Sequence, residues 1–264
     1  MSVSAAQGFR AAGATAGLKD SGASDVALVV NDGPRSAAAA VFTSNRVAAA
    51  PVRWSRRVLS DGAARAVVLN SGGANAATGA QGQADARASA EHVASRLGLD
   101  SQDVAVCSTG LIGERLDMPR LLTGIDAAVD GLAEEGGDDA ARAIMTTDTV
   151  PKQAVSRAEG YVLGGMAKGA GMLAPGLATM LCVLTTDADL PADVLQACLR
   201  EAVRTTFDRT DSDGCMSTND TVLLLASGAA DHTPEPDEFT HRLREVCADL
   251  ARQLIADAEG ARHE

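Results

Sequence analysis

Aromatic side chains are almost absent from this sequence, and their scarcity is the strongest constraint on how the chain folds. Only 2% of its 264 residues are aromatic, although 46% are hydrophobic. Trp54 and Tyr161 are the only tryptophan and the only tyrosine. The core must therefore be built from alanine, valine and leucine, which suits closely spaced layers of secondary structure. The same scarcity argues against a surface that stacks nucleobases, because such platforms use exposed rings.

Short apolar runs and helical patterns are mixed along the chain, which favours an α/β fold. Gly, Asn, Asp and Pro separate the apolar runs, as in the sequence NDGP at 31–34. The expected strands are 26–30, 38–42, 66–69, 104–107, 181–185 and 222–226. The expected helices, with apolar residues three and four apart, are 83–97, 119–132, 191–205 and 236–258. Residues 134–139 are expected to form a solvated loop.

The charged residues, cysteines and histidines exclude several classes of function. The net charge is -12, from 35 acidic and 23 basic residues, so an acidic surface disfavours nucleic acid as a partner. No secretory signal or membrane span is recognisable, and we expect a cytoplasmic protein without a membrane partner. Five widely spaced cysteines without a CxxC motif indicate reduced, mostly buried thiols. The four histidines form no ligand pattern, so we expect no zinc or other metal site.

The most informative segment runs from Lys168 to Asp187, with the sequence KGAGMLAPGLATMLCVLTTD. Its GAGMLA run matches the dinucleotide fingerprint formally, but proline and glycine follow where a helix should begin. We interpret the segment as a flexible glycine loop that delivers Ala178 and Thr179 to the start of a strand. If the bond before Thr179 is broken, its α-amine becomes a base beside its own hydroxyl. The alternative is that Thr179 is an ordinary β-branched residue in a strand.

A set of short motifs in a fixed order resembles the ornithine acetyltransferase family, also called the glutamate N-acetyltransferase or ArgJ family. The likeness covers nearly the whole chain, and no single motif would be sufficient. The motifs are GFRAAG at 8–13, NSGGANA at 70–76, STGLIG at 108–113, MTTD at 145–148, KGAGMLAP at 168–175, ATML at 178–181, STNDT at 217–221 and DAEG at 257–260.

This resemblance implies self-cleavage between Ala178 and Thr179, which gives an α chain of residues 1–178 and a β chain of residues 179–264. Thr179 would then take the acetyl group from N-acetylornithine and pass it to glutamate in a ping-pong exchange. No bound cofactor is implied, and some members also accept acetyl-CoA as a donor. The implied fold is a layered α/β sandwich of the N-terminal-nucleophile type, with helices flanking β-sheets. The implied assembly is a heterotetramer of two α and two β chains.

The resemblance also assigns roles to five further residues, each of which has a plainer interpretation. Thr109 and Gly110 would form the oxyanion hole, or simply a polar turn after a strand. Thr146, Lys168 and Glu259 would bind the substrate together with Thr179, and Lys168 is placed to pair with an α-carboxylate. The plainer interpretations are a polar cluster at a helix end for Thr146, a solvated lysine on a glycine loop for Lys168, and an exposed acid for Glu259.

The sequence differs from the family at its end. Family members continue for a further domain-sized segment beyond the DAEG motif, whereas this chain ends at Glu264. We therefore expect a β chain that is truncated relative to the family. Two alternatives to the acetyltransferase stay open: a self-processing amidase or aminopeptidase on the same scaffold, and a fragment without activity.

Overall fold

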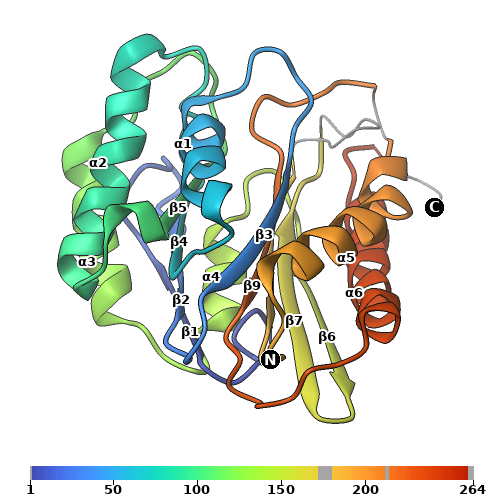
Figure 1. The fold of residues 1–264 in the computed structure, drawn as a ribbon. Coiled ribbons are helices and arrows are strands. Elements are labelled where there is room, and N and C mark those ends of the chain that lie inside the picture. Colours follow the sequence, from blue (N-terminus) through green and yellow to red (C-terminus); the bar gives the residue numbers. More distant parts are fainter. Residues whose placement is uncertain (1, 172–179, 212–213, 261–264) are drawn as a thin grey trace.

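Two β-sheets stacked face to face, with helices on both outer sides, make up the computed structural model (Figure 1). The structure describes residues 2–171, 180–211 and 214–260. The strands of the first sheet, in spatial order, are β1 (Phe9–Ala14), β2 (Val26–Asn31), β4 (Ala66–Asn70) and β5 (Val104–Ser108). The strands of the second sheet are β3 (Ala37–Phe42), β9 (Thr221–Ala226), β8 (Leu181–Thr186), β7 (Tyr161–Lys168) and β6 (Lys152–Ala158).

Six α-helices and three short 3₁₀ helices complete the described part of the chain. The α-helices are α1 (Ala50–Val58), α2 (Gly79–Leu97), α3 (Met118–Asp130), α4 (Gly137–Ala143), α5 (Ala192–Arg204) and α6 (Pro236–Ala256). The 3₁₀ helices are η1 (Leu59–Asp61), η2 (Ser101–Asp103) and η3 (Phe207–Arg209). Helices α1, α2 and α3 cover the first sheet, and α5 and α6 cover the second (Figure 1).

Most neighbouring strands are antiparallel, but each sheet contains one parallel pair. In the first sheet β4 and β5 run in parallel, with Asn70 opposite Ser108. In the second sheet β8 and β9 run in parallel, with Leu181 opposite Thr221. Carboxyl ends of parallel strands meet at one edge of a sheet, so the polar residues that follow β4 and β5 are brought together.

The layer between the two sheets is built from small apolar side chains, as the scarcity of aromatic residues predicts. Ala27 and Ala105 of the first sheet share a buried cluster with Val183 and Leu223 of the second. Strands β2, β4, β5, β8 and β9 are buried along their whole length. A strand buried on both faces is a continuous apolar run without alternation, which is why these strands stood out in the sequence.

The structure confirms the predicted α/β layers, and the predicted strands and helices occur within a few residues of their expected bounds. Two predicted loops are wrong in part. Helix α4 begins at Gly137, inside the expected loop 134–139, because its alanines pack into the core between the sheets. Lys168 is the last residue of strand β7 and does not lie on a loop, because residues 163–168 pair with β8 despite their glycines. Among the described helices, none combines the length and the apolar character that a membrane span requires.

Candidate active site

The turn after β5 is held by hydrogen bonds to β4, the strand parallel to it. The Thr109 amide donates to the Asn70 carbonyl oxygen at 2.9 Å. The Ser108 hydroxyl donates to Asn70 Oδ1 at 2.6 Å, and Asn70 Nδ2 donates to the Gly73 carbonyl oxygen at 2.9 Å. Thr109 is buried at this position. These bonds fix the backbone on which Thr109 and Gly110 stand.

Gly110 occupies a position that only glycine fits. Its φ of 124° lies in a region that side chains rarely adopt, and a Cβ would stand 2.8 Å from the Gly73 nitrogen. The Gly110 amide has no hydrogen-bond partner among the described residues. An unpartnered amide on the wall of a cavity is a ready donor to an anionic oxygen. The position is therefore compatible with the predicted oxyanion hole.

Lys168 projects from the end of β7 and brings two predicted site residues together. Its ammonium donates to the Thr146 hydroxyl at 2.6 Å and to the Thr109 hydroxyl at 3.3 Å. Because lysine can only donate, each hydroxyl oxygen accepts here and keeps its own proton for another acceptor. Lys168 is 2% exposed, so the interpretation of it as a solvated lysine is wrong. Burial lowers the pKa of Lys168, and the nearby Asp148 carboxylate only partly opposes this effect.

The buried Asp148 carboxylate contacts both Lys168 and the backbone of Thr146. Its carboxylate accepts hydrogen bonds from the Thr146 amide at 2.9 Å and the Gly169 amide at 2.7 Å, and it lies 3.8 Å from the Lys168 ammonium. Burial would raise the pKa of Asp148, but the Lys168 charge and the hydrogen bonds outweigh it and hold that pKa below its usual value. In the sequence, Asp148 is the last residue of the MTTD motif.

A second buried lysine connects Asp148 to the end of helix α6. Lys152 donates to Asp148 at 2.7 Å and also pairs with Asp257, just beyond α6. Asp257 in turn accepts a hydrogen bond from the Thr149 amide at 2.9 Å. Lys152 was not predicted from the sequence, because a single lysine at the start of a strand carries no signal of burial. Two residues after Asp257, the Glu259 amide donates to the Ala170 carbonyl oxygen at 2.6 Å.

The five predicted site residues within the described part of the chain line one cavity of about 590 Å³. They are Thr109, Gly110, Thr146, Lys168 and Glu259. Glu259 reaches it beside Gly171, where a Cβ would stand 3.1 Å from a Glu259 carboxylate oxygen. The complete wall consists of Leu18, Lys19, Asp20, Ser21, Ser71, Gly72, Thr109, Gly110, Leu111, Thr146, Thr147, Lys168, Gly171 and Glu259. Ala178 and Thr179, the predicted cleavage site and nucleophile, lie outside the described residues.

The residue after Thr179 is tied to a buried carboxylate. The Met180 amide donates to Asp220 Oδ1 at 3.0 Å, whereas Asp220 Oδ2 has no hydrogen-bond partner among the described residues. Asp220 is fully buried. Burial raises the pKa of Asp220 to about 8, although the Met180 amide, the nearby Ser217 and Thr43 hydroxyls and Lys168 all favour the charged form. Asp220 belongs to the STNDT motif, but its role as an anchor for Met180 was not predicted.

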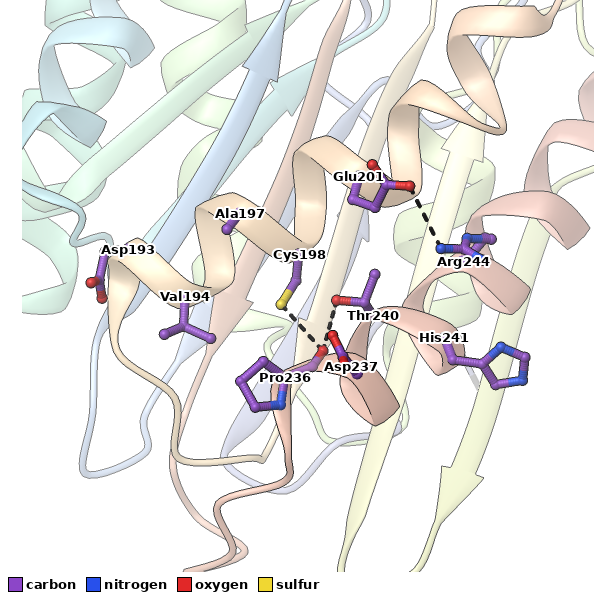
Figure 2. A pocket seen from close by; sticks show the side chains of 10 residues that line it. All are labelled: Asp193, Val194, Ala197, Cys198, Glu201, Pro236, Asp237, Thr240, His241 and Arg244. Atoms are coloured by element: carbon purple, nitrogen blue, oxygen red, sulfur yellow. Dashed lines mark hydrogen bonds and ion pairs between the residues drawn. The ribbon is translucent and has the colours of Figure 1, made fainter.

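A larger hollow, of about 700 Å³, lies elsewhere, between helices α5 and α6 (Figure 2). Its polar contacts include an exposed ion pair, Glu201 with Arg244 at 3.7 Å, and a hydrogen bond from Thr240 to the Pro236 carbonyl oxygen. None of the predicted site residues lines it. The smaller cavity is the better candidate, because buried charges and donors converge there.

The cysteines near the site in sequence are core thiols, as predicted. Cys107 and Cys182 are both buried in strands. Burial raises the pKa of Cys107 to about 12 and that of Cys182 well above its usual value. Thiols with such values are poor nucleophiles at neutral pH.

Comparison with known proteins identifies the family of the chain. The model of the ArgJ family matches residues 10–264. The chain is 64% identical to the arginine biosynthesis bifunctional protein ArgJ of Thermobifida fusca, over 99% of this chain and 68% of that protein. It is 65% identical to the protein of the same name from Streptomyces avermitilis, with the same coverage. The chain thus spans about two thirds of the length of these relatives.

Solved structures with similar folds include an ornithine acetyltransferase and a variant of the Ntn hydrolase fold. Ornithine acetyltransferase from Mycobacterium tuberculosis, solved in complex with ornithine, is 54% identical with a TM-score of 0.66, and the match covers 68% of this chain and 96% of that chain. An L-aminopeptidase D-Ala-esterase/amidase from Ochrobactrum anthropi, a variant of the Ntn hydrolase fold, has a TM-score of 0.55 at 13% identity and indicates only a shared fold. The chain belongs to the ArgJ family, the acyltransferases of arginine biosynthesis.

Proposed function

We propose that this chain moves an acetyl group from N-acetylornithine to glutamate through an acetyl ester on Thr179. The observation that carries the proposal is the convergence of the Lys168, Thr146 and Thr109 side chains on one cavity wall. The family to which the chain belongs supplies the reaction class, and this cluster supplies the donors that the reaction needs. The proposed path requires no bound cofactor, and acetyl-CoA is a candidate second donor.

The first step is self-cleavage between Ala178 and Thr179. The Thr179 hydroxyl attacks the Ala178 carbonyl carbon, the peptide C–N bond breaks, and water opens the resulting ester. This reaction leaves an α chain of residues 1–178 and a β chain that begins at Thr179. The new α-amine, with a pKa of about 8, is a local base for the hydroxyl on the same residue.

Acetyl transfer then proceeds in two half-reactions. The Thr179 oxygen bonds to the acetyl carbon of N-acetylornithine, the amide C–N bond breaks, and ornithine leaves with the hydroxyl proton. The negative charge that forms on the acetyl oxygen is stabilised by the Thr109 hydroxyl and the Gly110 amide, two donors on the cavity wall. In the second half-reaction the glutamate amine attacks the ester and restores the threonine.

Three residues bind the substrate in this proposal. Lys168 pairs with the α-carboxylate that both amino acids share, and Thr146 adds a hydroxyl donor beside it. Glu259 provides the negative charge for the side-chain ammonium of ornithine. The buried Asp148 holds Lys168 and Thr146 in position, because its carboxylate contacts the Lys168 ammonium and the Thr146 amide. We also propose the predicted heterotetramer of two α and two β chains as the assembly.

The amidase alternative is not favoured. Relatives that are 64% and 65% identical carry the ArgJ name, whereas the match named as an amidase is 13% identical and informs only on the fold.

The intact mass of the purified protein tests the first step, self-cleavage before Thr179. We expect two chains divided between Ala178 and Thr179, and one uncut chain for Thr179→Ala. Cleavage of Thr179→Ala at the same bond would point to an external protease.

A further inference from the structure

The two amino acids handled at this site differ in the charge at the end of their side chains. Ornithine ends in an ammonium and glutamate in a carboxylate, while the α-carbon groups are the same. One cavity that receives both in turn must therefore present a partner for each charge. Among the described residues of the cavity wall, the charged ones are Lys19, Asp20, Lys168 and Glu259. Lys168 and Glu259 have their roles in the proposed function, which leaves Lys19 as the remaining cation.

Lys19 is partly buried, and no carboxylate among the described residues forms an ion pair with it. Its ammonium donates one hydrogen bond, to the Ser24 carbonyl oxygen at 2.7 Å. Burial lowers the pKa of Lys19, and the more distant Asp25 and Asp148 charges only partly oppose this effect. Withdrawing an ammonium from water without a partner is unfavourable, so an anion in the cavity would satisfy it.

The loop that carries Lys19 is fixed by a fully buried aspartate. The Asp25 carboxylate accepts hydrogen bonds from the amides of Ala16 and Leu18 at 2.6 Å each, and from the Lys19 amide at 3.2 Å. The Asp25 carbonyl oxygen also accepts from the Ser71 amide at 2.9 Å, which ties the loop to the end of β4. The backbone below Lys19 is thus held in place before any ligand arrives, which reduces the entropic cost of binding.

We infer that Lys19 binds the side-chain carboxylate of glutamate and so determines the acceptor specificity of the site. This inference rests on the proposed function. Lys168 holds the α-carboxylate at the inner end of the cavity, and Lys19 meets the second carboxylate on the wall formed by residues 18–21. In the step concerned, the glutamate nitrogen bonds to the acetyl carbon, the ester C–O bond to Thr179 breaks, and the amine proton passes to the threonine oxygen.

The test measures the two half-reactions separately in Lys19→Met. Ornithine release from N-acetylornithine should keep its normal rate, because that substrate has no side-chain carboxylate. Decay of the acetyl-enzyme should require about 10- to 100-fold more glutamate, the usual effect of one lost hydrogen bond to a charged group. Glutamine has the same shape without the charge. The preference for glutamate over glutamine should therefore disappear in Lys19→Met and persist in Lys19→Arg.

Arg142 provides the matched control. It is an exposed cation in a neighbouring hollow of about 400 Å³ that Lys19 also lines, but it does not line the main cavity. Arg142→Met should leave the glutamate preference unchanged. The inference is overturned if Lys19→Met slows both half-reactions equally, if it leaves glutamate use unaltered, or if Arg142→Met abolishes the preference instead. Failure of the unmodified protein to release ornithine would contradict the proposed function itself. Normal ornithine release by Lys19→Met would show that this variant is folded.

Discussion

Lys152 and Asp148 form an ion pair of 2.7 Å in which neither side chain has any exposed surface. Two opposite charges without water are stable only when their remaining hydrogen-bonding positions are also filled. Here the Thr146 and Gly169 amides bind Asp148, and Asp257 binds Lys152 on its other side. This buried pair therefore connects the Lys168 cluster on β7 with the segment after α6 that carries Glu259.

Removal of one member of this pair should strongly destabilise the fold. Lys152→Met leaves the Asp148 and Asp257 carboxylates without their shared cation, so we expect a loss of about 3–5 kcal/mol in the free energy of unfolding. Denaturant titration in a Thr179→Ala background, where a single chain is expected, measures this loss. Arg87→Met breaks the exposed pair with Glu91 and should cost less than about 1 kcal/mol. Equal, small losses in both variants would contradict a structural role for the buried pair.

Replacement of the Thr109 hydroxyl should slow the chemistry without unfolding the protein. Thr109→Ala removes one of two proposed oxyanion donors, and we expect the rate of acetyl transfer to fall by roughly 100- to 1,000-fold. Thr109→Ser keeps the hydroxyl and should retain most of the rate. Single-turnover release of ornithine is the appropriate measurement. An unchanged rate in processed Thr109→Ala would remove Thr109 from the mechanism.

The sequence predicted the buried strands well, because strands that are covered on both faces are uninterrupted apolar runs. It did not predict β7 and misplaced Lys168 on a loop, since glycines in a strand resemble a loop until a partner strand is known. Thr109, Gly110, Thr146, Lys168 and Glu259 come from four motifs that are far apart in the chain, and the structure places them on one cavity.

The missed residues of the site share a physical cause. Lys152 and Asp220 are fully buried polar groups, and burial of a charge depends on tertiary contacts that no local pattern reports. The sequence did not mark Lys19 as a site residue either, because its burial also depends on tertiary contacts. Its environment depends on the Asp25 carboxylate, which organises the loop through backbone amides.

Asp220 should make the stability of the protein depend on pH. Its pKa is raised from 3.8 to about 8 in the folded state, so folding takes up a proton between these values. The stabilisation is complete below pH 4 and is lost as the pH rises through about 8, with a slope of at most about 1.4 kcal/mol per pH unit. Asp220→Asn cannot titrate and should lack this slope. Unfolding curves of both proteins between pH 5 and 9 test this, and parallel pH profiles would contradict the assignment.

The location of the acetyl group after exposure to N-acetylornithine tests the central claim most directly. Peptide mapping by mass spectrometry of the processed protein, quenched before glutamate is added, identifies the modified residue. We expect an acetyl group on Thr179 at the start of the β chain, and we expect glutamate to remove it as N-acetylglutamate. An acetyl group on a cysteine such as Cys182, or no acetylated residue in protein that is cut between Ala178 and Thr179, would contradict the account.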